Sequence, residues 1–418
     1  MRLVSSIVLS LWVLAMAPAG ALAQPTMTRA CVRGDVVVVS GTSFPEPADM
    51  LPLFVDDFES GSPGAPIADG EGAWVEGAVS PLYSDELAFG GTQAGVADYD
   101  RQGSDWVQAY VELEERDEVY TSAWIYVDYG PDPEAPTDNN SLKLLSLYSS
   151  EFYTGRPSLD WTSMGSTSRN ALYSMYGAEG GTYVYEYGTG FQTGRWVRGE
   201  LYFRLSSPAG AANGQAQAWL DGVDQEILVD QTITRDEGVE RGLTIAGFWR
   251  GWARSPAGAK VYVDDAYVGA TRARVEVGVG ARFEDAARRQ LQRIEEASAD
   301  EITVSLRLHA FAADADLHLY VIDADGRASD GHPLTDLPPC DPVEPDAGGP
   351  SLDAGPTRDG GADMRDAGAG VEEDDAPTTS GGCRVAGQAT GTGRGLLLVL
   401  PAVVAGLRRR KAGRGRRE

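Results

Sequence analysis

Aromatic and cationic side chains gather in the middle of this sequence, between residues 143 and 252. Two of the cations, Lys143 and Arg169, are candidates for chemistry, and the candidate rings are Tyr148, Tyr153, Trp161, Tyr173, Tyr176, Tyr183, Tyr185, Tyr187, Trp249 and Trp252. Tyr and Trp offer flat apolar faces with polar tips, which suit sugar rings. Alternatively, such rings are core or cross-strand pairs of a β-sheet. Strand alternation places Tyr183, Tyr185 and Tyr187 on one face without saying whether that face meets solvent.

Histidine chemistry is absent from this part of the chain. The three histidines, His309, His318 and His332, all follow residue 300, and we interpret them as surface residues of a separate module. The sequence contains no HExxH, P-loop, GxSxG or CxxC motif. These observations argue against a zinc site, a nucleophile triad or a histidine base among the aromatic residues.

The elements that must position these side chains are predicted to be strands. Alternating runs rich in Val, Tyr, Trp and Phe occur at Tyr120–Tyr126, Glu200–Leu205, Gln215–Leu220 and Lys260–Val263. No amphipathic helix is evident between residues 45 and 270. The sequence therefore predicts a mainly β protein, with one large sandwich over residues 45–271.

A small appended module is predicted over residues 272–337. Phe283, Ala287, Leu291 and Ile294 recur at helical spacing and predict one helix. Two strands should follow, at Ile302–Ala310 and Leu317–Asp323, with a turn at Asp325-Gly326. Residues 24–44 form a separate N-terminal strand segment, and the sequence does not show which unit this segment joins.

The order of motifs in the large sandwich resembles a known family. The motifs are FVDDFESG (54–61), GRW (194–196) followed by ELYF (200–203), NG (213–214), WLDG (219–222) and VYVDDAYV (261–268). Together they resemble a concanavalin A-like jelly roll, in particular the polysaccharide-lyase-like branch that includes glucuronan and alginate lyases. The resemblance covers about residues 54–270.

The resemblance implies a catalytic set for β-elimination: Lys143, Arg169, Tyr183 and Tyr185. The cations would neutralise a uronate carboxylate, and a tyrosine would take the C5 proton and protonate the leaving oxygen. Two departures from the family pattern, Glu186 and the lack of a histidine, lead us to favour polysaccharide binding over lysis. The candidate sugar-binding rings are then Tyr148, Trp161, Tyr173 and Tyr187. A structural or protein-binding surface module is the third alternative.

Carboxylates at both ends of the jelly roll form a second candidate site. Asp57 and Glu59 lie near its start, and Asp264 and Asp265 lie near its end. In related jelly rolls such carboxylates hold a structural Ca²⁺, and oxygen ligands suit this ion. The alternative is that they are acidic loop residues facing water. The sequence implies no cofactor for chemistry.

The charge of the chain limits which partners it can bind, and its cysteine content bears on the compartment in which it folds. The net charge is −27 although residues 384–418 carry nine basic residues and one acid, so the rest of the chain is strongly acidic. Such a field repels phosphate backbones and argues against a nucleic-acid partner. Cys31 and Cys340 flank the folded part and are predicted to form a disulfide, which leaves Cys383 with another role.

Both ends of the sequence indicate export. Residues 1–23 have the charge, apolar run and Ala-Leu-Ala box of a cleaved signal peptide, with Ala23 before the cut. Residues 338–382 form an acidic Asp-Ala-Gly stalk that is predicted to be disordered. The tail, 383–418, resembles the C-terminal sorting signal of myxobacterial surface proteins, in which the tail is removed near a cysteine that Cys383 matches. We therefore expect a surface protein, associated with the outer membrane through this tail, that binds extracellular or envelope polysaccharide.

Overall fold

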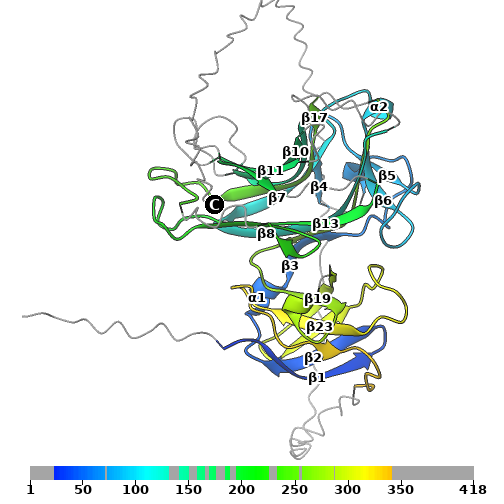
Figure 1. Ribbon diagram of the computed structural model, residues 1–418, viewed down its shortest axis with the longest axis vertical. Coiled ribbons are helices and arrows are strands. Elements are labelled where there is room, and N and C mark those ends of the chain that lie inside the picture. The colour runs from blue at the N-terminus through cyan, green and yellow to red at the C-terminus, as the bar shows by residue number, and fades with distance from the viewer. Residues whose placement is uncertain are drawn as a thin grey trace, which may run out of the picture. The chain divides into compact units, whose positions relative to one another are not determined.

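The structure is a computed structural model, and it describes residues 23–340 apart from nine gaps. These gaps are 71–72, 131–140, 150–157, 165–168, 176–183, 189–193, 226–232, 254–256 and 287. Nearly all of the regular structure is antiparallel β-sheet (Figure 1). Within these ranges no helix has the length and apolar character needed to cross a membrane. The predicted signal peptide up to residue 22, the stalk from 341 onwards and the tail with Cys383 lie outside the described residues.

The larger sandwich consists of two sheets. In the first, the strand order is β15-β14-β13-β8-β18-β6-β5, and β3 also pairs with β18. The bounds are β3 Pro52–Asp56, β5 Leu82–Ser84, β6 Ala94–Asp98, β8 Glu118–Asp128, β13 Trp196–Arg204, β14 Gln215–Leu220, β15 Val223–Asp224 and β18 Lys260–Gly269. The four alternating runs of the sequence thus lie in β8, β13, β14 and β18, side by side in one sheet.

The second sheet has the strand order β12-β11-β10-β9-β16-β7-β4, with β17 paired to β9. The bounds are β4 Trp74–Glu76, β7 Gln108–Arg116, β9 Ser141–Tyr148, β10 Ser158–Met164, β11 Arg169–Met175, β12 Val184–Gly188, β16 Leu243–Arg250 and β17 Trp252–Ala253. Figure 1 shows β7, β10 and β11 in one layer, apart from β8 and β13 in the other. Short helical turns, η1 Ile67–Asp69 and α2 Tyr99–Gln102, lie in the connections.

A core of aromatic and aliphatic side chains fills the space between the two sheets. Phe58 stacks on Trp74, with ring centroids 5.8 Å apart, and meets Trp249 edge-on at 6.0 Å. The inward residues alternate with outward ones, as Leu142 and Leu144 do on either side of Lys143. This arrangement is the β-sandwich that the alternation predicts.

The smaller sandwich is built from both ends of the folded chain. One sheet has the order β1-β2-β22-β21 and the other β20-β19-β23-β24. The bounds are β1 Thr26–Arg33, β2 Val36–Thr42, α1 Pro47–Met50, β19 Arg274–Val279, η3 Phe283–Asp285, β20 Arg289–Leu291, β21 Arg293–Ala297, β22 Glu301–Ser305, β23 Leu317–Ile322 and β24 His332–Pro333. Because β2 pairs with β22, the N-terminal segment belongs to this sandwich, and the jelly roll is inserted between its two parts.

The helix predicted from Phe283 to Ile294 is wrong. Among the described residues of this span only the single turn η3 is helical, and β20 and β21 follow it. Arg289 and Gln292 are buried and bind polar groups from distant segments: Arg289 donates to Glu276, and Gln292 accepts from the backbone N–H of Arg307. These tertiary bonds favour extended backbone over the helix that the apolar spacing predicts.

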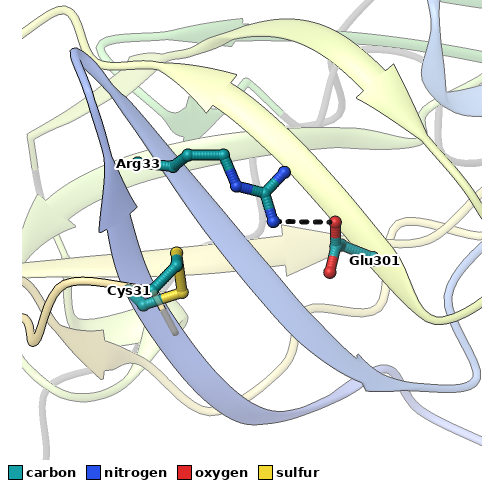
Figure 2. The surroundings of a disulfide bond; sticks show 4 residues. Cys31, Arg33 and Glu301 are labelled. Atoms are coloured by element: carbon teal, nitrogen blue, oxygen red, sulfur yellow. Dashed lines mark ion pairs between the residues drawn. A yellow bond between two sulfur atoms is a disulfide. The ribbon is translucent and has the colours of Figure 1, made fainter. Parts of the chain in front are cut away.

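A disulfide closes the smaller sandwich (Figure 2). It joins Cys31 of β1 to Cys340, which is 309 positions later in the sequence. The backbone N–H of Cys340 also donates to the carbonyl of Val32, at 2.9 Å. Beside the disulfide, Arg33 forms an exposed ion pair with Glu301 of β22, at 3.7 Å. The two ends of the described chain are therefore held together by covalent and polar contacts.

A buried ionic cluster joins β13 of the jelly roll to β19 and β20. Glu276 accepts hydrogen bonds from three guanidinium groups: Arg198 at 3.0 Å, Arg274 at 2.5 Å and Arg289 at 3.0 Å. Arg198 also lies 3.3 Å from Glu200. Burial alone would raise the pKa of Glu276, but the three cations outweigh it and hold that pKa well below its usual range.

Candidate functional site

The candidate site is the outer face of the second sheet. Leu142 and Leu144 point into the core, so Lys143, between them on β9, belongs to the opposite face, where its side chain is half-buried. On β7 the same rule separates the core residues Ala109 and Val111 from Tyr110, which is half-buried on the outer face.

Backbone register aligns one row of positions across six strands of this sheet. From β7 to β12 the row is Tyr110, Gly247, Ser146, Asp160, Tyr173 and Tyr185. Five steps between neighbouring strands of about 4.8 Å give the row a length of about 24 Å. The next row contains Lys143, Thr162, Ala171 and Tyr187. The fold therefore brings three segments that are distant in sequence into adjacent rows.

Two more of the predicted residues occupy other register positions. Arg169 is the first residue of β11 and pairs with Met164, at the end of the sheet beyond the row of Lys143. Trp161 pairs with Leu172, and Leu172 pairs with Glu186. These three residues form a separate row between the row of Tyr173 and Tyr185 and the row of Tyr187. The register thus separates position 186 from the tyrosine rows. Tyr183 lies outside the described residues.

Tyr148 does not fit the sugar-stacking role predicted for it. Its side chain is 5% exposed, and the guanidinium carbon of Arg250 lies 4.1 Å from the centroid of its ring. A ring face already covered by a cation is closed to a sugar. Tyr148 instead supports Arg250 by a cation–π contact.

Sequence reasoning missed the contribution of β7 to this face. Gln108 donates from its side-chain amide to the backbone carbonyl of Arg250, at 3.0 Å. Burial first, and then the nearby carboxylate of Glu112, raise the pKa of Tyr110, so its phenol is a hydrogen-bond donor at neutral pH. The sequence pattern that could have predicted this strand is its alternation of polar and apolar residues: Gln108, Tyr110 and Glu112 alternate with Ala109 and Val111.

The four carboxylates predicted to hold calcium do not fit such a site, because protein donors occupy them. Asp57 and Asp265 both pair with Arg307 of the smaller sandwich. Asp264 accepts three backbone N–H groups, from Phe89, Gly90 and Asp265. Glu59 accepts from the backbone N–H and the hydroxyl of Thr92 and from the backbone N–H of Gln93. Among the described residues no group of three or more His, Cys, Asp or Glu is placed to hold a metal ion.

Asp264 is nevertheless electrostatically unusual. Burial first, and the neighbouring Asp265 second, raise the pKa of Asp264 to about 8, despite the three N–H groups that stabilise its charge. The adjacent Asp265 and Asp57 both pair with Arg307, whose own pKa is raised by these two carboxylates although burial alone would lower it. This cluster therefore joins the two sandwiches through the ion pairs of Arg307 with Asp57 and Asp265.

Comparisons with known proteins identify no family. No family model and no curated protein matches the sequence. Among solved structures, the alginate lyase Aly36B is similar, with 12% identity and a TM-score of 0.38 over 53% of this chain and 97% of that one.

Two further solved structures show a similar level of likeness. The alginate lyase vAL-1 from Chlorella virus has 9% identity and a TM-score of 0.30, over 59% of this chain and 90% of that one. The carbohydrate-binding module CBM66 from Bacillus subtilis has 10% identity and a TM-score of 0.27, over 47% and 95%. Identities and TM-scores this low leave the ligand and activity of this chain to be argued from its own residues.

Proposed function

We propose that this protein binds an extracellular or envelope polysaccharide along the outer face of the β7–β16–β9–β10–β11–β12 sheet. The observation that carries the proposal is the backbone register, which aligns Tyr110, Tyr173 and Tyr185 in one row and Lys143 and Tyr187 in the next. Tyrosine combines a stacking surface with a hydrogen-bond donor, and lysine attracts anionic groups on the polymer.

Spacing favours binding over lysis. Lys143 on β9 and Tyr185 on β12 are three strands apart, so their backbones are separated by about 14 Å. A general base must come within hydrogen-bond reach of the proton it removes, while the charge stabiliser contacts the same uronate unit. Residues spread over several strands suit successive rings of a polymer. β-Elimination by Lys143, Arg169, Tyr183 and Tyr185 stays a prediction, and formation of an unsaturated product would reveal it.

Attachment to the cell surface is a second part of the proposal. Its support is the sequence of the two ends: the Ala-Leu-Ala box before residue 24, and Cys383 ahead of an apolar segment and a basic cluster. A polysaccharide-binding face on a surface-anchored protein would act as an adhesin.

Lysine distribution allows a direct test of the face. Between residues 24 and 340 the chain has two lysines, Lys143 on the outer face and Lys260 on β18 of the other sheet. The protein is screened against immobilised uronate polymers and neutral glycans, and its amines are then labelled with and without the polysaccharide that binds. The proposal requires protection of Lys143 while the labelling of Lys260 is unchanged.

Matched variants complete the test. Lys143→Gln should weaken binding by roughly 10- to 100-fold, which is the worth of a hydrogen bond to a charged group. Lys260→Gln, which removes the same charge from the opposite sheet, should leave the affinity unchanged. Failure to bind any polysaccharide, or equal labelling of Lys143 in both states, would overturn the proposal.

A further inference from the structure

An exposed tryptophan lies beside the candidate face. Trp106 is 50% exposed, whereas the other large apolar side chains exposed on the described parts of the chain are aliphatic. A single exposed apolar residue needs no functional explanation by itself. The position and the contacts of Trp106 are what indicate a role for it.

The position of Trp106 follows from the alternation of β7. Val107 is buried in the core like Ala109 and Val111, so Trp106 has the same parity as Gln108 and Tyr110. Trp106 therefore continues the outer face of this strand beyond the N-terminal end of β7. It adds an accessible ring just before the strand on which Tyr110 begins the tyrosine row.

A glycine lies between Trp106 and the backbone of Lys143. Gly251 has a φ of +92°, and a Cβ atom at this position would lie 2.9 Å from Cε3 of Trp106 and 2.8 Å from the carbonyl oxygen of Asp105. The carbonyl of Gly251 accepts a hydrogen bond from the backbone N–H of Lys143, at 3.1 Å. Trp106 and Lys143 are thus connected through one residue.

The backbone around Trp106 is also held in place. Its N–H donates to the hydroxyl of Ser104 at 3.0 Å, and Val107, which follows it, is fully buried and forms a β-bridge with Val79. A ring on a fixed backbone loses little conformational freedom when a ligand stacks on it, which favours binding.

We propose that Trp106 forms an additional sugar subsite at the β7 end of the face, where its indole stacks on a pyranose ring next to the unit contacted by Lys143. This inference rests on the proposed polysaccharide binding and deepens it, because it assigns the aromatic platform to a residue outside the family-like set. The indole offers the largest flat apolar surface of any side chain, together with one N–H donor. The ligand is therefore a polymer with an anionic unit at Lys143 and a stacking ring at Trp106.

The test measures the affinity of the full chain for the polysaccharide selected in the screen. Trp106→Ala should weaken binding by about 3- to 10-fold, as expected for a lost aromatic contact. Trp106→Phe keeps a flat ring and should retain most of the affinity. Leu308→Ala, a truncation of an exposed apolar side chain on the smaller sandwich, serves as the matched control and should have no effect.

Oxidative footprinting provides an independent readout. Trp106 should be oxidised readily in the free protein and protected when the polysaccharide is bound. The subsite is refuted if the wild type binds, Lys143→Gln weakens binding, and Trp106→Ala behaves like Leu308→Ala. If the wild type binds no polysaccharide, the proposed function and the subsite fall together.

Discussion

Substitution of Glu276 by Gln should destabilise the protein strongly. The Glu276 side chain is 0% exposed and accepts from Arg198, Arg274 and Arg289. The amide of Gln keeps the shape but offers one acceptor oxygen, and its NH₂ group faces cations. Arg198 keeps Glu200 at 3.3 Å, but the other two guanidinium groups lose their buried countercharge. Breaking a buried pair in this way costs about 3–5 kcal/mol in the free energy of unfolding.

A matched control is available on the surface. Glu301 pairs with Arg33 at 3.7 Å and its side chain is 45% exposed, so Glu301→Gln is the same chemical change in solvent. It should cost less than about 1 kcal/mol. Urea unfolding followed by tryptophan fluorescence measures both variants. Equal midpoints for Glu276→Gln and Glu301→Gln would refute the role assigned to the cluster.

The pH dependence gives a second check on Glu276. A carboxylate whose folded pKa is depressed contributes stability above its unfolded pKa, near 4.5, and this contribution is lost as the pH falls towards the folded value. The difference in unfolding free energy between wild type and Glu276→Gln should therefore be full at pH 7. It should shrink as the pH falls below about 4.5.

Four further predictions concern other parts of the molecule. Cys31→Ser opens a loop of 309 positions and should lower stability by up to roughly 5–6 kcal/mol in the chain-entropy model, measured by urea unfolding without reductant. The raised pKa of Asp264, about 8, means that this group costs stability as the pH rises from about 4 to 8; Asp264→Asn should remove a slope of up to about 1.4 kcal/mol per pH unit, and an unchanged slope would contradict the burial argument. Chelator should leave the melting temperature unchanged because Arg307 already pairs with Asp57 and Asp265, the carboxylates beside Asp264; a lower melting temperature in EDTA would support the calcium hypothesis. Cys383→Ala should leave protein unprocessed or released, as judged by mass and cell fractionation, and normal surface retention would disprove the sorting prediction.

Local alternation predicted the strands of the large sandwich well. The run Gln215–Leu220 has the bounds of β14, and its alternate residues are buried. The run Tyr120–Tyr126 lies inside β8, whose other face is also buried because Tyr120 packs with Tyr202, Tyr267 and Leu291. Period-2 patterning reports one buried face, so it could identify this strand but not its second contact.

The disulfide between Cys31 and Cys340 was predicted because cysteines are few, but ion pairs and strand register between distant segments could not be predicted. Arg307 lies 250 positions after Asp57, and nothing local in the sequence shows that the two residues form an ion pair. Trp161 was grouped with the other sugar-binding rings, yet it pairs with Leu172, in the row that alternates with the row of Tyr173 and Tyr185. Which residues of neighbouring strands pair with one another depends on the strand register, and the local sequence does not determine this register.

The insertion of the jelly roll into the smaller sandwich changes how the molecule responds to force and to proteases. The chain enters the jelly roll after α1 and leaves it before β19, so two covalent crossings connect the two units. A pull applied beyond Cys340 reaches the jelly roll through both crossings, because the disulfide ties that end to β1. A single cut at either crossing would leave the jelly roll tethered by the other. A protein built in this way retains its jelly roll after damage that would release a domain attached by one linker.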